Sequence, residues 1–176
     1  MRKIKNPLLF NCDFQSYLAI KSLPVDVFTF FDNFGEGGTG VYFTPKSEGL
    51  SVENAILALV LNPTMKYGEY FVTEETEEEI FELNLKTLKP EYLDEFQEVA
   101  ASKILALKDR TLPNRIKKSA KNFNWSGKID RKEWLHLTDF QPIKITAYQM
   151  VDNWNHEELF IQTDDYFIRW VWSTAA

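Results

Sequence analysis

The stretch ELFIQTDDYFIRWVWS, residues 158–173, contains two β-prone runs joined by a two-residue polar connection, Asp164–Asp165. This arrangement predicts a β-hairpin. Successive side chains of a strand point to opposite faces. The second run therefore has Ile168, Trp170 and Trp172 on one face, and Phe167, Arg169 and Val171 on the other. Both faces are mainly apolar, which predicts a strand that is covered on both sides.

Further strands are expected outside this hairpin. The runs 25–34 (VDVFTFFDNF) and 40–45 (GVYFTP) are rich in Val, Phe and Thr and meet across the glycine-dense segment 35–40 (GEGGTG), which predicts a second hairpin. The β-branched segment 142–151 (PIKITAYQMV) predicts another strand, followed by a turn at Asp152–Asn153. One more strand is expected at residues 66–72.

Helices are expected between these strands. Ser51 can cap a helix over residues 52–61, and Asn62–Pro63 is expected to end it because the residue before proline avoids the α region. Thr76 and Glu79 fit a capping box that opens a second helix. A third helix is expected from Pro90, since apolar residues follow at helical spacing: Leu93, Phe96, Ala100, Ile104 and Leu107. Residues 14–22 fit either a short helix or a strand.

These patterns predict an α+β protein with a mostly antiparallel sheet of five or six strands and inserted helices packed on one face. The 176 residues show no internal repeat and no low-complexity linker, so a single domain over residues 1–176 is expected. Cys12 alone cannot form an internal disulfide, and the amino terminus lacks the apolar run of a signal peptide. No segment approaches the roughly 20 apolar residues that span a bilayer. We therefore expect a cytoplasmic protein that does not enter a membrane.

The charge of the chain reverses near its middle. Residues 69–98 contain eleven carboxylates and two lysines, a local charge of −9, and residues 103–132 contain ten cations and two aspartates, a local charge of +8. The whole chain has a net charge of −6. Carboxylates in a first helical turn are favoured by roughly 0.3–1 kcal/mol each, so helix capping and solubility are a sufficient alternative explanation of the acids. A divided surface of this kind can also steer a charged partner.

Motifs for catalysis or metal binding are sparse. The segment GEGGTG fits G-x-G-x-x-G, but a strand pattern follows it, and its glycines are expected to supply positive φ angles in a turn. A small enzyme or ligand-binding domain with a pocket near Gly35–Gly40, using Cys12 or a histidine, is kept as an alternative. The segment beginning at His156 starts like H-E-x-x-H, but position 160 is Phe. With two His and one Cys, neither a metal nor a cofactor is expected.

A second alternative is a nucleic-acid-binding protein. The basic block 110–132 interleaves its cations with Phe123 and Trp125, a mixture that single-stranded nucleic acid binding uses. The isoelectric point of about 5.0 and the adjacent acidic block oppose this interpretation, because both repel a polyanion. Nucleic acid is therefore not the expected partner.

Residues 157–176, EELFIQTDDYFIRWVWSTAA, combine an acidic and aromatic hairpin with a Trp-Ser-Thr-Ala ending. In this the chain resembles bacterial immunity proteins, including those paired with contact-dependent growth-inhibition toxins. The resemblance implies a protein that binds a cognate toxin, commonly a nuclease, and covers its active site or disables it from the side. It assigns no individual residues.

An electrostatic argument agrees with this implication, because a nuclease active site is cationic and clustered carboxylates complement it. The leading hypothesis is a stoichiometric toxin inhibitor without catalytic activity, whose acidic segment meets a basic toxin surface. The expected partner-binding acids are Glu74, Glu75, Glu77, Glu78, Glu79, Glu82, Glu91, Asp94, Glu95 and Glu98, and the expected aromatic anchors are Tyr70 and Tyr92. A general interaction protein without a toxin partner is a third hypothesis. Nothing in the sequence fixes the oligomeric state.

Overall fold

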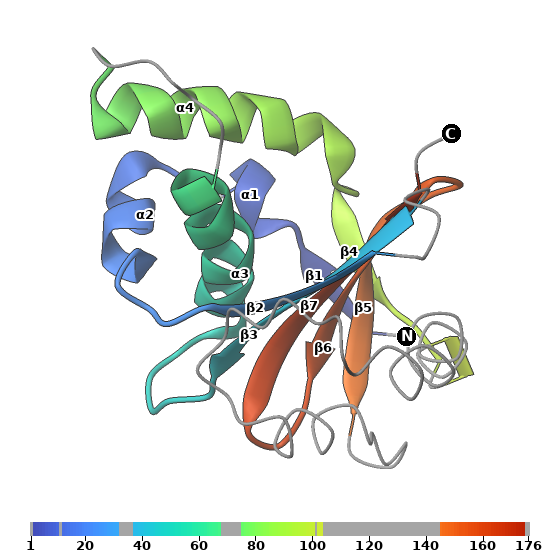
Figure 1. The fold of residues 1–176 in the computed structure, drawn as a ribbon. Helices are drawn as coiled ribbons and strands as arrows, with labels where there is room; N and C mark the ends of the chain where they lie inside the picture. The colour runs from blue at the N-terminus through green and yellow to red at the C-terminus, as the bar shows by residue number, and fades with distance from the viewer. Residues whose placement is uncertain are drawn as a thin grey trace.

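A computed structural model describes residues 2–10, 12–31, 37–67, 75–100, 102–103 and 145–174 (Figure 1). The strands in these residues are β1 (Lys3–Lys5), β2 (Asp26–Phe31), β3 (Gly37–Pro45), β4 (Glu95–Glu98), β5 (Thr146–Asn153), β6 (His156–Gln162) and β7 (Tyr166–Thr174). The helices are α1 (Pro7–Phe10), α2 (Phe14–Ile20), α3 (Val52–Tyr67) and α4 (Glu77–Leu88), and a 3-10 turn, η1 (Lys89–Glu91), follows α4.

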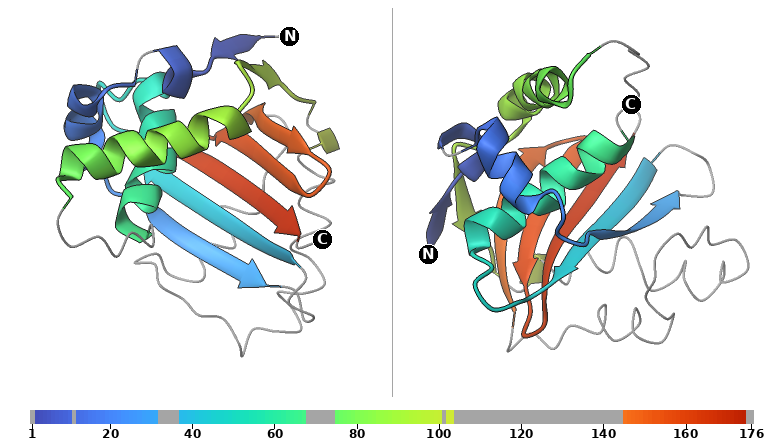
Figure 2. Two further views of the ribbon diagram at one scale, coloured as in Figure 1. Left: turned by 90° about the horizontal axis from the view of Figure 1, so that it is seen from above. Right: turned by 90° about the vertical axis from the view of Figure 1, so that its left-hand side faces the viewer.

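The strands form one antiparallel sheet in the order β1-β4-β5-β6-β7-β3-β2. The helices lie together on one face of this sheet (Figures 1 and 2). The predicted α+β class, with helices packed on one face, is therefore confirmed. The described sheet has seven strands instead of five or six. The strands that the prediction missed, β1 and β4, have three and four residues and are too short for their alternation to stand out in the sequence.

The C-terminal hairpin lies at the centre of the sheet. β6 and β7 flank Asp164–Asp165 as predicted, and β7 pairs on its other side with β3, from Gly37↔Thr174 to Pro45↔Tyr166. Phe167 is buried in the cluster on the helical face, whereas Ile168 and Trp170 are buried on the opposite face. The expectation that this strand is covered on both sides is confirmed, and so is the hairpin of β2 and β3.

Helix α3 does not end at Asn62–Pro63, so this prediction is wrong. It continues through Pro63 to Tyr67, and residues 55–61 are all buried. Proline lacks an N–H, so the carbonyl of Leu59, four residues earlier, loses its intrahelical donor. Nη1 of Arg169 on β7 donates to that oxygen instead, at 3.4 Å. Burial and this contact outweigh the ~3 kcal/mol cost of an interior proline.

Two further predictions, a strand at residues 66–72 and a helix from Pro90, differ from the structure. The strand predicted at residues 66–72 is wrong for Lys66 and Tyr67, which are helical, and residues 68–72 lie outside the described part. The helix predicted from Pro90 is wrong as well. Pro90 lies in η1, and the chain then forms β4, in which Phe96 is fully buried. This strand pairs with β1 on one side and with β5 on the other. Pairing with two strands outweighs the local helical spacing. Residues 104 and 107 lie outside the described part.

Helices α2 and α4 begin at side-chain caps. Oδ1 of Asp13 accepts a hydrogen bond from the Ser16 amide at 2.7 Å, and residues 14–20 are helical. At α4 both halves of the predicted capping box are present. The amide of Glu79 donates to Oγ1 of Thr76 at 3.3 Å, and the amide of Thr76 donates to Oε2 of Glu79 at 2.8 Å. The prediction of a helix that starts at Thr76 is confirmed.

The glycines of the GEGGTG segment that the structure describes do not form a turn. Gly37, Gly38 and Gly40 lie in β3, and Gly38 and Gly40 pair with both β2 and β7. The expectation of positive φ angles is wrong for these three glycines, and Gly35 lies outside the described part. The positive-φ glycine found in the described residues is Gly49, with φ 84°, in the loop before α3. Backbone paired on both sides presents no row of free N–H groups to a phosphate.

Candidate functional site

The carboxylates of α4 face outward. Phe81, Asn84 and Leu85 are buried against the helical-face core and fix the orientation of the helix. The exposed carboxylates are Glu75, just before the helix, and Glu77, Glu78, Glu79 and Glu82 within it, followed by Glu91, Asp94 and Glu95; Glu98 is half-buried. We refer to Glu75, Glu77, Glu78, Glu79, Glu82, Glu91 and Asp94 as the acidic surface.

Four of the predicted acids have partners within the fold. Glu77 forms an ion pair with Lys21 at 3.0 Å, Glu79 belongs to the capping box, Glu95 pairs with Lys3 at 2.7 Å, and Glu98 accepts from the Arg2 amide at 2.9 Å. Within the described residues, the other five have neither an ion pair nor a side-chain hydrogen bond: Glu75, Glu78, Glu82, Glu91 and Asp94. Their charges therefore remain available to a partner.

The basic block does not neutralise these acids where the structure describes it. Lys103 is the described cation of that block, and its ammonium group pairs with Glu157 at 3.1 Å and Asp152 at 3.7 Å. Both carboxylates lie outside the acidic block. The residues 110–132 invoked for nucleic acid binding lie outside the described part.

A shallow groove runs beside α4. Its volume is about 520 Å³, and it is lined by Glu75, Glu79, Glu82, Leu83, Leu85, Lys86 and Lys89. Leu83 is 40% exposed. The groove therefore combines three carboxylates and two ammonium groups with an apolar contact. The sequence did not indicate this contact because Leu83 fits the apolar spacing of any amphipathic helix.

Tyr92 does not belong to the acidic surface, and the prediction that it anchors a partner is corrected. Its side chain is 6% exposed, and its hydroxyl group donates to Oε2 of Glu158 at 3.0 Å. The turn after η1 directs this ring into the core under β6. Two further predicted partner-binding residues, Tyr70 and Glu74, lie outside the described part.

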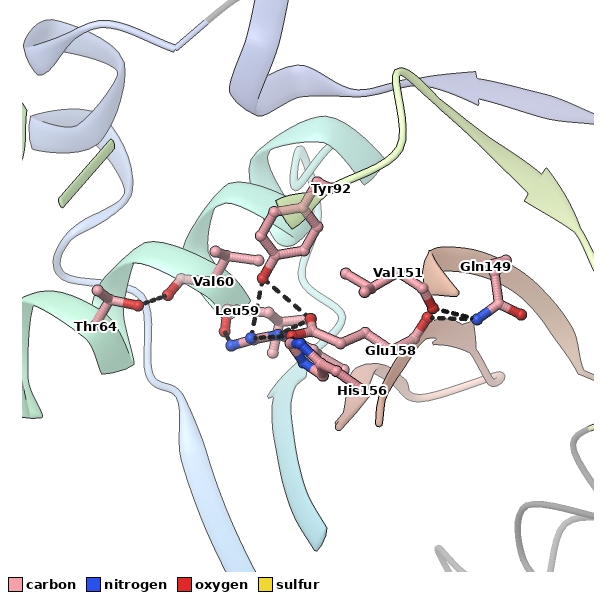
Figure 3. Close-up of polar contacts among 9 residues, drawn as sticks. Leu59, Val60, Thr64, Tyr92, Gln149, Val151, His156 and Glu158 are labelled. Carbon is pink, nitrogen blue, oxygen red and sulfur yellow. Dashed lines mark hydrogen bonds and ion pairs between the residues drawn. The ribbon is translucent and has the colours of Figure 1, made fainter. Parts of the chain in front are cut away.

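Tyr92 belongs to a buried polar network that crosses the sheet-helix interface (Figure 3). Glu158 is 1% exposed, and its carboxylate accepts from Nε and Nη2 of Arg169 at 2.7 and 2.8 Å. Nε2 of His156 lies 2.8 Å from Oε1 of the same carboxylate. Arg169 Nη2 also donates to the Tyr92 hydroxyl group at 3.0 Å, and Nη1 reaches Leu59 O. The network joins α3, β6, β7 and the segment after η1.

The protonation states of this network follow from its geometry. Burial favours the neutral form of Glu158, but the Arg169 charge and hydrogen bonds from His156 and Arg169 hold the pKa of this carboxyl group well below its usual value. The hydrogen bond to Glu158 raises the pKa of His156, and the charge of Glu91 adds to this. The carboxylate, the guanidinium group and the hydroxyl group are mutually satisfied, so the network is suited to holding the fold together.

Features of other function classes are weak in the described part. Burial raises the pKa of the Cys12 thiol to about 11, so this thiol is protonated near neutral pH and is a poor nucleophile. The described residues hold no group of three or more His, Cys, Asp or Glu side chains that could bind a metal ion. None of the described helices is both long and apolar enough to cross a membrane.

Comparisons of the chain with models of protein families, with curated proteins and with solved structures found no match.

Proposed function

We propose that the protein is a stoichiometric inhibitor of the immunity type, which binds a toxin through the acidic surface in the cytoplasm of the cell that makes it. The observation that carries this proposal is the set of five exposed carboxylates without partners in the described residues: Glu75, Glu78, Glu82, Glu91 and Asp94. A nuclease must hold phosphate, so its active site is cationic and complements such a surface.

Helix capping does not account for all of these acids. Glu77, Glu78 and Glu79 lie in the first turn of α4, where the helix dipole favours them. Glu82 lies beyond that turn, four residues after Glu78 and four residues before Lys86, so a like-charge and an opposite-charge contribution of ~0.2–0.5 kcal/mol each oppose one another. Helix stability alone therefore does not select an acid at position 82, which supports a role for Glu82 in binding.

The spacing of these acids lets their fields add. Side chains three or four residues apart on a helix lie ~5–6 Å from one another at Cβ, which is within the ~8 Å screening length at physiological salt. Glu78 and Glu82 have this spacing within α4, and Glu75 lies just before the N-cap residue Thr76. Such a cluster can raise the association rate with a basic protein toward ~10⁸ M⁻¹s⁻¹ at low salt. Leu83 lies beside them as an apolar contact.

A differential capture experiment tests the proposal. The purified protein is immobilised and exposed to lysate of its source cells, beside the variant Glu78→Lys/Glu82→Lys and a control variant Glu48→Lys/Asp165→Lys. The control makes the same change in net charge at two exposed carboxylates in the loops beside β3 and β7, away from α4 (Figure 1). The polypeptide retained by the wild-type protein is then identified and purified.

The proposal predicts one basic polypeptide that the wild-type and control proteins retain and the α4 variant loses. Its toxic activity should be abolished at one-to-one stoichiometry by the wild-type protein. Equal retention by the α4 variant, or retention of nucleic acid in place of a protein, would contradict the proposal.

A further inference from the structure

Four large apolar side chains are exposed among the described residues: Phe10, Leu83, Leu93 and Trp154, with exposed fractions of 62, 40, 39 and 75%. Scattered apolar residues on a surface are ordinary. These four, however, lie in α1, in α4, in the segment after η1, and in the turn between β5 and β6. All of these elements are at the upper end of the molecule in Figure 1, and the left view of Figure 2 looks down on that end.

Hydrogen bonds connect the segment after η1 to its neighbours. The amide of Leu93 donates to Met150 O on β5 at 3.0 Å, and Nδ2 of Asn6 donates to Leu93 O at 2.9 Å. The charge of Glu91 acts on His156, the first residue of β6. The segment 91–94 therefore lies between the α1 region on one side and the β5–β6 hairpin on the other. It continues the acidic surface from α4 toward Trp154.

Trp154 is not required by the hairpin that carries it. Asn153 pairs with His156, so Trp154 and Asn155 form a two-residue turn, where Asn, Asp and Gly are the favoured residues. No non-glycine residue in the described part has a positive φ angle, so this backbone places no special demand on the side chain. An indole group left three-quarters exposed is not stabilised by the core either.

The turn holds this indole group on a rigid support. The amide of Thr174 donates to Asn155 O at 2.9 Å, and His156 is bound to the buried Glu158 carboxylate. Asp152, whose side chain is exposed, lies two residues before Trp154. A Trp side chain has only two torsion angles to immobilise on binding, and Trp is among the residues that dominate interface energetics.

We infer that Trp154 is the main apolar anchor of the partner interface and inserts into an apolar pocket of the same basic protein that the acidic surface attracts. This inference rests on the proposed function. An interface of standard size covers about 800 Å² on each protein, a patch about 30 Å across. Helix α4 has 12 residues and is therefore ~18 Å long. A partner centred on α4 therefore extends beyond the helix, and the segment with Leu93 continues from α4 toward β5, to which the Leu93 amide is bonded.

Binding kinetics test the inference. The polypeptide captured above is purified, and its association and dissociation rates are measured by surface plasmon resonance with the wild-type protein, Trp154→Ala and Trp154→Tyr. Trp154→Ala should raise the dissociation rate about 30-fold or more and change the association rate less than about twofold. Trp154→Tyr retains an aromatic ring and should show a smaller increase. Both variants should melt within about 2 °C of the wild-type protein, since the side chain is mostly exposed.

The outcomes separate this inference from the proposed function. An unchanged dissociation rate for Trp154→Ala overturns the role of Trp154, while slower association of Glu78→Lys/Glu82→Lys in the same assay keeps the proposed function. No effect of either variant overturns both. If the wild-type protein is a dimer in sedimentation velocity and Trp154→Ala is a monomer, a second copy of the chain occupies this site and the inference is wrong.

Discussion

At the residue scale, Glu158 and Arg169 explain how two charges are kept inside the helical face of the sheet. They project from the neighbouring strands β6 and β7, and each oxygen of the carboxylate has two donors from Arg169, Tyr92 and His156. An unmatched ion in a protein interior costs several kcal/mol. The Glu158–Arg169 ion pair is therefore compatible with the core only while both charges and their hydrogen-bond partners are present.

The first prediction concerns this mutual dependence. Glu158→Gln keeps the shape of the side chain but leaves the buried Arg169 without a counter-ion, so the free energy of unfolding should fall by ~3–5 kcal/mol. Urea denaturation followed by circular dichroism measures this difference. Glu48→Gln, at an exposed carboxylate outside the network, is the control and should lie within ~0.5 kcal/mol of the wild-type protein. Equal stability of Glu158→Gln and the control would contradict the account of the network.

The second prediction is a pH dependence that arises from His156. Its folded pKa is raised above the ordinary value of ~6.5. The stabilisation that protonated His156 provides through Glu158 is therefore fully present below pH ~6.5 and is lost as the pH rises through the folded pKa of His156. The groups that act on His156 are Glu158, Glu91 and Arg169. The melting temperature should fall between pH 6 and pH 8, and this fall should be weaker in His156→Gln.

Glu158 produces a pH dependence of stability with the opposite sign at acid pH. Its folded pKa is lowered, so its contribution is present above the ordinary carboxyl pKa of ~4.3 and is lost as the pH falls below that value. Stability should therefore be greatest between these two limbs. Melting curves recorded from pH 3 to pH 8 test both limbs, and an identical slope above pH 6 in His156→Gln would remove His156 from the explanation.

At the element scale, α3 shows how the sheet compensates for a proline inside a helix. The Leu59 carbonyl that Pro63 leaves without a donor is the one that Arg169 reaches. Local sequence rules predicted a helix end at this position because they do not include a donor from a strand more than a hundred residues later. The capping box of α4 was predicted correctly for the opposite reason, since Thr76 and Glu79 are three residues apart.

The third prediction tests this cap. Thr76→Ala removes the side chain that accepts the Glu79 amide and should lower the free energy of unfolding by ~1 kcal/mol. Thr87→Ala is a matched control, because the Thr87 hydroxyl group bonds only to the Leu83 carbonyl of its own exposed helix face. That control should be neutral or slightly stabilising, given the higher helix propensity of alanine. A similar loss in both variants, measured by urea denaturation, would rule out the cap as the cause.

The segment after α4 marks a limit of local prediction. Leu93 and Phe96 have helical spacing, but the chain forms β4 because β1 and β5 supply hydrogen-bond partners on both sides. Those partners come from the first few residues of the chain and from beyond residue 145. The two hairpins, β2–β3 and β6–β7, were predictable because each pairs residues that are close in sequence.

At the scale of the whole molecule, the α+β class and the position of the helices on one face could be predicted, since hydrophobic patterning reflects which faces are covered. The candidate surface could be predicted only in part. Carboxylates without partners stay in water whatever the topology, so the exposure of the acids followed from their chemistry. Aromatic residues are placed by the fold. Tyr92 enters the core beside Glu158, whereas Trp154 is left at a turn.

The salt dependence of association is the most direct test of the central claim, that exposed acids on α4 attract a basic partner. The association rate of the wild-type protein with the captured polypeptide is measured from about 0.02 to 0.5 M NaCl, where the screening length falls from ~20 to ~4 Å. We predict a steep fall with salt, and for Glu78→Lys/Glu82→Lys a rate about tenfold lower at low salt with a shallower slope. A rate that is independent of salt and equal in the two proteins would contradict the claim.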